Sequence, residues 1–96
     1  MKYRISDKAL EDINKIWAYT LENWSQQQAD RYYNLIFQEI LFISENFESG
    51  KDIGKIKSGY RQTKIKSHLI IYKKASDGMV EIIRVLHQMM DIPNQL

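Results

Sequence analysis

The spacing of apolar residues changes from helical to alternating at Ser49-Gly50, and this change limits the folds open to the chain. Before it, apolar residues recur every three or four positions, which is the period of an amphipathic helix. After it, apolar and polar residues alternate, which is the period of a half-buried strand. The predicted strands cover residues 60–66, 68–73 and 79–86. Helices that precede a run of strands favour an α+β fold.

Two predicted helices, preceded by a short strand over residues 2–6, make up the first half of the chain. The apolar face of the first helix consists of Leu10, Ile13, Trp17, Leu21 and Trp24. Ser25 and Gln28 form a capping box, in which a hydroxyl accepts from a free amide at the start of the second helix. Helices joined by so short a turn run antiparallel. We therefore expect β-α-α-β-β-β, with an antiparallel helical hairpin from about residue 7 to residue 47 packed on an antiparallel sheet.

Length and composition indicate a small protein without thiol chemistry. The 96 residues are enough for a single domain, residues 1–96, with a core that folds unaided. The absence of cysteine excludes disulfides, thiolate nucleophiles and most zinc sites, and we expect no metal and no cofactor. No apolar run approaches the roughly 18 residues of a membrane span, and residues 1–12 lack the apolar segment of a signal peptide. We predict a cytoplasmic protein that does not enter membranes.

Charge is divided unevenly between the two halves, although the net charge is only +2. Residues 1–50 hold five Lys or Arg against eight Asp or Glu, whereas residues 51–96 hold nine against four. The basic second half predicts an acidic partner or nucleic acid, and lysines solvated on an exposed sheet face explain it equally well. The excess is smaller than in proteins that track phosphate backbones, so we expect no strong direct binding to nucleic acid.

The last predicted strand places one arginine in an apolar run, I-I-R-V-L-H at residues 82–87. Strict alternation puts Val80, Ile82, Arg84 and Leu86 on one face and Glu81, Ile83, Val85 and His87 on the other. We expect Arg84 to pair with a carboxylate or with backbone carbonyls, and Asp91 is one candidate. Alternation on neighbouring strands also allows one polar cluster, made of Arg61, Arg84 and either His68 or Tyr72. The period alone leaves open which faces meet.

Four motifs in order carry a family resemblance over essentially the whole chain. They are W-S-Q-Q-Q-A-D-R-Y-Y-N-L-I in the second helix, G-Y-R at residues 59–61, H-L-I-I-Y at 68–72 and I-I-R-V-L-H-Q-M-M-D at 82–91. Together they resemble the ParE toxins of the RelE/ParE superfamily. The chain departs from the family pattern at E-N-F-E-S-G, which lacks the proline of N-P-x-x-G, and at Met89, where a basic residue is common.

The resemblance implies the toxin component of a type II toxin–antitoxin system, neutralised by a ParD-like antitoxin in a hetero-oligomer. The superfamily contains two activities, and we expect inhibition of DNA gyrase by binding. The alternative is a RelE-like ribosome-dependent endoribonuclease, in which Arg61 and Arg84 would hold the scissile phosphate and His87 would transfer a proton. A bare interaction module whose purpose is to bind one partner is a third possibility. We favour gyrase because the basic charge is small for a protein that docks on ribosomal RNA.

Two sets of contact residues follow from this interpretation. The candidates for binding the target are Arg61, His68, Tyr72, Arg84 and His87. The candidates for binding the antitoxin are Trp17, Leu21, Tyr32, Leu35, Lys64 and Lys66. The second set combines the wide apolar stripe of the hairpin with lysines of the basic half, which suits an acidic helix that docks in an apolar groove.

Overall fold

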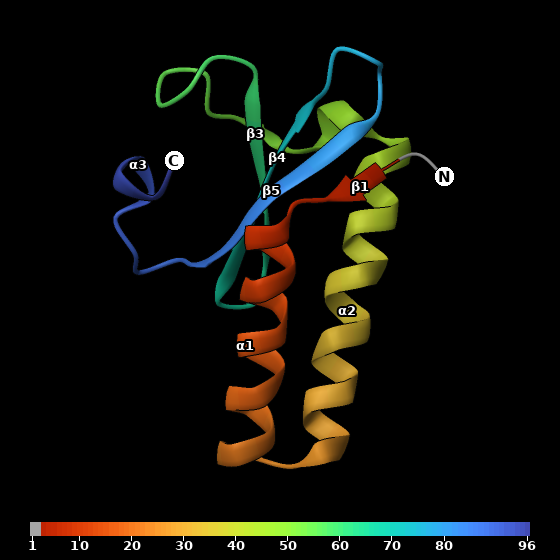
Figure 1. Ribbon diagram of the computed structural model, residues 1–96, viewed down its shortest axis with the longest axis vertical. Coiled ribbons are helices and arrows are strands. Elements are labelled where there is room, and N and C mark those ends of the chain that lie inside the picture. Colours follow the sequence, from red (N-terminus) through yellow and green to blue (C-terminus); the bar gives the residue numbers. More distant parts are fainter. Residues whose placement is uncertain (1–2) are drawn as a thin grey trace.

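The computed structural model describes residues 3–96 and shows two long helices beside a twisted sheet (Figure 1). The helices are α1 (Asp7–Asn23), α2 (Gln26–Glu45), the short 3-10 helix η1 (Phe47–Ser49) and α3 (Ile92–Gln95). The strands are β1 (Tyr3–Ile5), β2 (Lys51–Asp52), β3 (Tyr60–Ile65), β4 (His68–Lys74) and β5 (Val80–His87). The predicted α+β class and the helical hairpin are confirmed. Lys2, which the predicted first strand included, lies outside the described residues.

The sheet has the strand order β1-β5-β4-β3-β2, and its strands β2 to β5 are antiparallel as predicted. The edge strand β1 instead runs parallel to β5, with Tyr3 opposite Val80 and Ile5 opposite Ile82. Parallel neighbours need a long connection, and here the hairpin and three other strands lie between the two in sequence. The antiparallel sheet predicted over residues 60–87 is confirmed, and β1 adds a parallel strand at its edge, for which no pairing was predicted.

The strand β2 was missed because two residues are too few to show a period. It lies between the predicted helical hairpin and the strand predicted from residue 60, and Lys51 and Asp52 pair with Gln62 and Arg61. The preceding Gly50 is buried against β4, where an added Cβ would overlap the Tyr72 hydroxyl. A side chain is therefore excluded at the point where the helical half of the chain enters the sheet.

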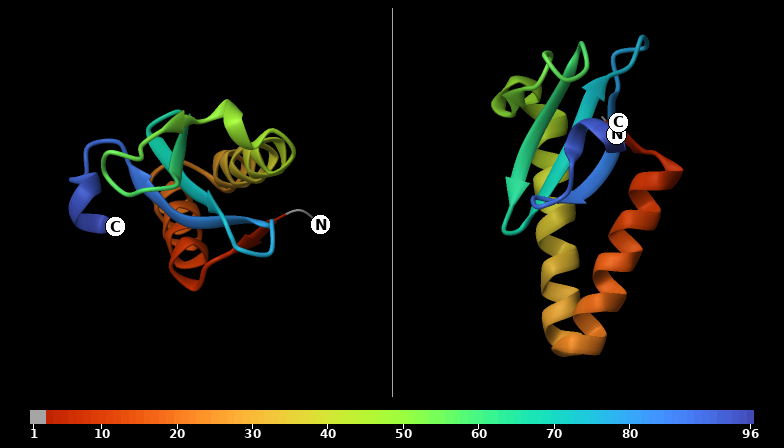
Figure 2. Two further views of the ribbon diagram at one scale, coloured as in Figure 1. Left: turned by 90° about the horizontal axis from the view of Figure 1, so that it is seen from above. Right: turned by 90° about the vertical axis from the view of Figure 1, so that its left-hand side faces the viewer.

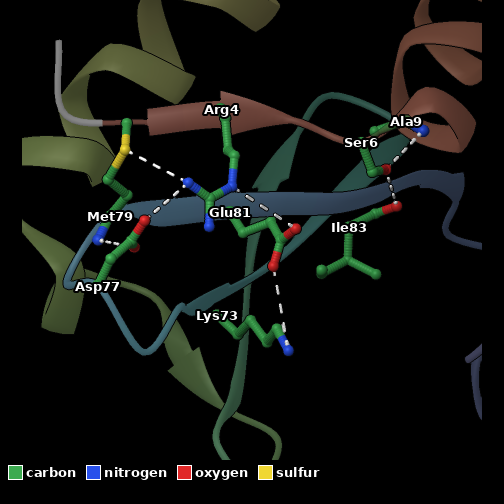
Figure 3. Close-up of polar contacts among 8 residues, drawn as sticks. All are labelled: Arg4, Ser6, Ala9, Lys73, Asp77, Met79, Glu81 and Ile83. Atoms are coloured by element: carbon green, nitrogen blue, oxygen red, sulfur yellow. Dashed lines mark hydrogen bonds and ion pairs between the residues drawn. The ribbon is translucent and has the colours of Figure 1, made fainter.

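Polar side chains in and just after β1 bind the β4–β5 turn and β5 (Figure 3). The Arg4 guanidinium lies 3.0 Å from an Asp77 carboxylate oxygen in the β4–β5 turn and 3.9 Å from Glu81 on β5. Just after β1, the Ser6 hydroxyl donates to the Ile83 carbonyl at 2.8 Å and accepts the Ala9 amide at 3.0 Å. Ser6 therefore extends the strand pairing and caps α1 with one hydroxyl.

The main core lies between the hairpin and the sheet. It includes Ile13, Ile36, Ile40, Ile43, Ile70, Tyr72, Ile82 and Val85, all buried. A smaller cluster covers the other face of the sheet, where Ile71, Leu86 and Ile53 pack with Ile92 and Leu96 of the C-terminal segment. Part of the apolar surface of the hairpin stays open within residues 3–96, where Trp24 is 73% exposed.

A β-bulge in β5 changes which residues share a face. Tyr72 lies opposite Ile82, but Ile71 lies opposite Arg84, which leaves Ile83 without a partner in the register. Strict alternation along the last strand was therefore wrong beyond Ile83. Val85 joins the hairpin-side core and Leu86 the opposite cluster, whereas alternation had placed them the other way round.

The hairpin extends beyond the part of it that the sheet covers (Figure 2). The buried residues of α1, Ala9 and Ile13, lie in its first half, and three of the four in α2, Ile36, Ile40 and Ile43, lie in its second half. At the tip, from about residue 16 to residue 28, the sheet-facing side of the hairpin is therefore exposed to solvent. No helix within residues 3–96 is long and apolar enough to cross a membrane.

Candidate functional site

Arg84 is held by a carboxylate from the hairpin. Its Nε and one terminal nitrogen donate to the two Asp12 oxygens of α1 at 2.8 and 3.0 Å, and the arginine side chain is only 16% exposed. The same carboxylate accepts the Val85 amide at 3.0 Å. The hydrogen bond that the Arg84 guanidinium donates to Asp12 raises the pKa of Arg84. The predicted pairing is confirmed, and the partner is Asp12 rather than Asp91, which accepts from Asn94 instead.

Arg84 also reaches the C-terminal segment, where it donates to the Gln95 carbonyl at 3.4 Å. Its neighbour on β4 is Ile71, which belongs to the cluster on the α3 side of the sheet. The Arg84 side chain therefore leaves the strand on that side and extends around the edge of β5 to α1. The edge is open there because β1 ends at Ile5, opposite Ile82. The pair formed by Arg84 and Asp12 therefore joins α1, β5 and α3.

Arg61 occupies a separate place, beside the junction of α2 and the sheet. It donates to the Gly50 carbonyl at 2.7 Å, and its guanidinium carbon lies 5.4 Å from the centre of the Phe47 ring. Its neighbour on β4 is Tyr72, which is buried in the main core and donates to the Phe47 carbonyl at 2.8 Å. Arg61 thus lies with the hairpin-side face, whereas Arg84 lies with the opposite face.

His68 and His87 come together with Tyr32 where β4 begins and β5 ends. The two imidazole rings meet edge to face with their centres 5.3 Å apart. The Tyr32 hydroxyl lies 2.7 Å from Nδ1 of His68 and 3.0 Å from the Ile65 carbonyl oxygen. Burial lowers the pKa of His68, and the neighbouring His87 lowers it further. Burial also raises the pKa of the Tyr32 hydroxyl.

This histidine cluster borders a groove of about 700 Å³ between the hairpin tip and the β3–β4 turn. Three of the predicted antitoxin-binding residues line it: Tyr32, Leu35 and Lys66. The other three lie elsewhere: Trp17 donates to Asp30 at 3.0 Å, Leu21 is exposed on α1, and Lys64 sits opposite Leu69, with the α3-side cluster.

The groove-lining residues that sequence reasoning missed include Lys15, Tyr19 and Trp24 near the tip, and Arg31 on α2. Tyr19 is 65% exposed. None of the described residues lining the groove is acidic, so its charged groups are cationic. The sequence does show aromatic residues near the turn between the two helices. Only the position of the sheet shows that these aromatic residues are left uncovered.

The structure divides the predicted target-binding residues among three places. Arg84 pairs with α1, Arg61 and Tyr72 hold the segment after α2, and the two histidines border the groove. Among residues 3–96, no hydrogen bond or ion pair links Arg61, Arg84 and His87, and the arginines belong to opposite faces. The described residues also contain no group of three His, Cys, Asp or Glu side chains placed to hold a metal ion.

Comparison with known proteins places this architecture in a family. The family model for the ParE toxin of the type II toxin–antitoxin system parDE matches residues 3–92. The Toxin ParE1 of Mycobacterium tuberculosis (strain CDC 1551 / Oshkosh) is 30% identical over 95 residues, which cover 99% of this chain and 97% of that protein. The Toxin ParE1 of Caulobacter vibrioides is 36% identical over 89 residues, covering 93% and 91%.

A solved structure described as the chromosomal ParDE TA system from P. aeruginosa has the same fold. Its TM-score is 0.78 at 13% identity, with 91% of this chain and 95% of that chain covered. The fold and the family match together define a toxin of a type II toxin–antitoxin system. Within that class, the chain belongs to the ParE toxin family.

Proposed function

We propose that this toxin inhibits DNA gyrase by binding it, in the cytoplasm, and that a ParD-like antitoxin neutralises it in a hetero-oligomer. The observation that carries the proposal is that its two candidate phosphate-binding arginines already form hydrogen bonds to other groups of the protein. Arg84 is paired with Asp12 and Arg61 with the Gly50 carbonyl. A binding surface suffices for an inhibitor, whereas cleavage of RNA needs free cations and proton-transfer groups around one phosphate.

The ribonuclease alternative required Arg61, Arg84 and His87 to converge. The arginines belong to opposite faces of the sheet, and His87 lies with His68 at the groove. This arrangement gives the two arginines no common phosphate to hold. Family membership at 30% and 36% identity to proteins named Toxin ParE1 also supports the ParE interpretation over the RelE one.

The groove at the hairpin tip is the surface that suits the antitoxin best. Its lining combines the aromatic side chains of Tyr19, Trp24 and Tyr32 with the cations Lys15, Arg31 and Lys66. An amphipathic acidic helix offers the matching apolar stripe and charge. We expect Trp24, as the most exposed aromatic in the groove at 73%, to contribute a large part of the contact.

A pair of assays tests the target. Purified toxin is added to a gyrase supercoiling assay, and in parallel to an in vitro translation reaction in which mRNA cuts are mapped. We expect loss of supercoiling and intact mRNA. Codon-specific cuts with unaffected supercoiling would establish the ribonuclease instead. An adjacent reading frame that encodes an acidic protein of about 80 residues would have the size expected of the family's antitoxins. Addition of its purified product should restore gyrase activity.

A further inference from the structure

The histidine cluster places two imidazoles on the groove, and imidazole is the side chain that most often serves as a proton-dependent switch in proteins. His68 and His87 are the only histidines in the sequence, and they are opposite each other in the register of β4 and β5. His68 is half-buried, whereas His87 is exposed at the end of its strand. Both side chains line the groove together with Tyr32. Two adjacent imidazoles on a binding surface can bind a charged side chain of the molecule that occupies the groove.

The hydrogen bonds of the cluster show where a proton can be added. The Tyr32 hydroxyl has one hydrogen, and when it donates to the Ile65 carbonyl, Nδ1 of His68 must carry a hydrogen and donate to the hydroxyl oxygen. Nε2 of His68 is then the free nitrogen, and it forms no hydrogen bond within residues 3–96. A proton can bind there without breaking any bond of the cluster.

His87 is arranged differently. Its Nδ1 accepts the Met89 amide at 3.1 Å, so the neutral ring carries its hydrogen on Nε2. That hydrogen is available to an acceptor outside the chain. With a hydrogen on each Nε2, His68 and His87 together therefore present two N–H donors beside the groove, which is a match for the two oxygens of a carboxylate.

The surrounding charges favour an anion. The titratable groups that line the groove from the packed elements are Lys15 and Tyr19 on α1, Arg31 and Tyr32 on α2, and Lys66 in the β3–β4 turn. With no acidic group among the described lining residues, nothing in the groove neutralises these cations. Burial and His87 already hold the pKa of His68 below its usual range.

We propose that His68 and His87 form a proton-dependent receptor for a carboxylate side chain of the antitoxin, so that the antitoxin binds more tightly at acidic pH. The proposal rests on the proposed function, because it needs an acidic antitoxin segment in this groove. A carboxylate within about 4 Å of an imidazole favours the charged form, so docking takes up a proton at His68. Affinity therefore rises as the pH falls from 8 toward 6, and we expect a gain of about five- to tenfold.

The experiment measures binding of the purified product of the adjacent reading frame to the full toxin at pH 6.0 and pH 8.0. Four proteins are compared: the wild type, His68→Gln, His87→Gln and Gln28→Ala. Glutamine keeps hydrogen-bonding ability but does not titrate. Gln28 lines the same groove and has no titratable group, so Gln28→Ala should weaken binding equally at both pH values. Titration of the antitoxin itself is common to all four proteins and cancels in the comparison.

We expect the wild type and Gln28→Ala to keep the pH effect and His68→Gln to lose it. His87→Gln should reduce the effect, since one of the two donors is replaced. Should His68→Gln fail to fold, NMR titration of the imidazole protons in the wild type, free and in complex, measures the same proton directly. An equal pH dependence in all four proteins, or no proton uptake at His68 on binding, would overturn the receptor. Absence of any complex at either pH would overturn the proposed antitoxin partnership as well.

Discussion

Arg84 and His87 lie three positions apart on β5, yet Arg84 is largely buried and His87 is exposed to solvent. The Arg84 guanidinium has partners on α1 and in the C-terminal segment, and only 16% of the side chain is exposed. His87 is exposed, and among residues 3–96 only its Nδ1 is occupied by a hydrogen bond. The difference teaches which polar residues of a short strand hold the protein together and which remain available to a partner.

The largest effect should come from Arg84→Ala. It leaves the Asp12 carboxylate without its ion pair at a site where that side chain is only 12% exposed. We expect the free energy of unfolding to fall by about 3 kcal/mol, measured by urea denaturation. The double variant with Asp12→Ala should lose less than the sum of the two single changes. Wild-type stability combined with lost toxicity would instead make Arg84 a contact residue.

A smaller loss is expected from Tyr32→Phe. The change removes the hydroxyl between the Ile65 carbonyl and His68, at a partly buried site, and leaves the ring in place. We expect a loss of about 1 kcal/mol in the free energy of unfolding. The imidazole signals of His68 should also shift in the NMR spectrum. A variant with unchanged stability and an unchanged His68 titration would show that the cluster is not held by this hydroxyl.

Charge reversal distinguishes the two faces of the sheet. Lys66 lines the groove, whereas Lys64 projects with the opposite face. Lys66→Glu should therefore slow association with the acidic antitoxin by about three- to tenfold, and Lys64→Glu by less, because charges near a docking site act mainly on the encounter rate. Stopped-flow association at low and high salt measures both. Equal slowing by the two variants would place the acidic segment across both faces.

The smallest effect on stability should follow His87→Gln. Since the side chain is exposed at the end of a strand, we expect the free energy of unfolding to stay within about 0.5 kcal/mol of the wild type. Inhibition of gyrase should largely persist, because glutamine still forms hydrogen bonds. Loss of toxicity with an intact fold, together with mRNA cuts by the wild type, would favour proton transfer by His87.

Local periodicity predicted the hairpin, the antiparallel strands and the need of Arg84 for a partner. It could not name Asp12, which lies 72 residues away and meets Arg84 only because the bulge at Ile83 and the early end of β1 leave the edge open. The contact between His68 and His87 depends on the same register. The bulge has no signature in the apolar run I-I-R-V-L, since Val85 and Leu86 are equally suited to burial and either could fill the hairpin-side core.

The groove was only partly predicted for a related reason. Tyr32, Leu35 and Lys66 follow from apolar width and basic charge, but Trp17 and Leu21 have the same apolar character and lie outside it. Which of these residues face the groove depends on where the sheet stops along the hairpin. That position is fixed by long-range packing between the second half of α2 and strands β4 and β5, which no short window of sequence contains.

The pairing of β1 with β5 bears on how the toxin is made. Ser6 contacts Ile83 across 77 residues and Asp12 contacts Arg84 across 72, so the first strand of a nascent chain has no neighbour until the last strand has been translated. Contacts so distant in sequence form slowly. We expect the helical hairpin to be synthesised before the strands that cover it and to wait, with its sheet-facing side uncovered, until β4 and β5 have been translated.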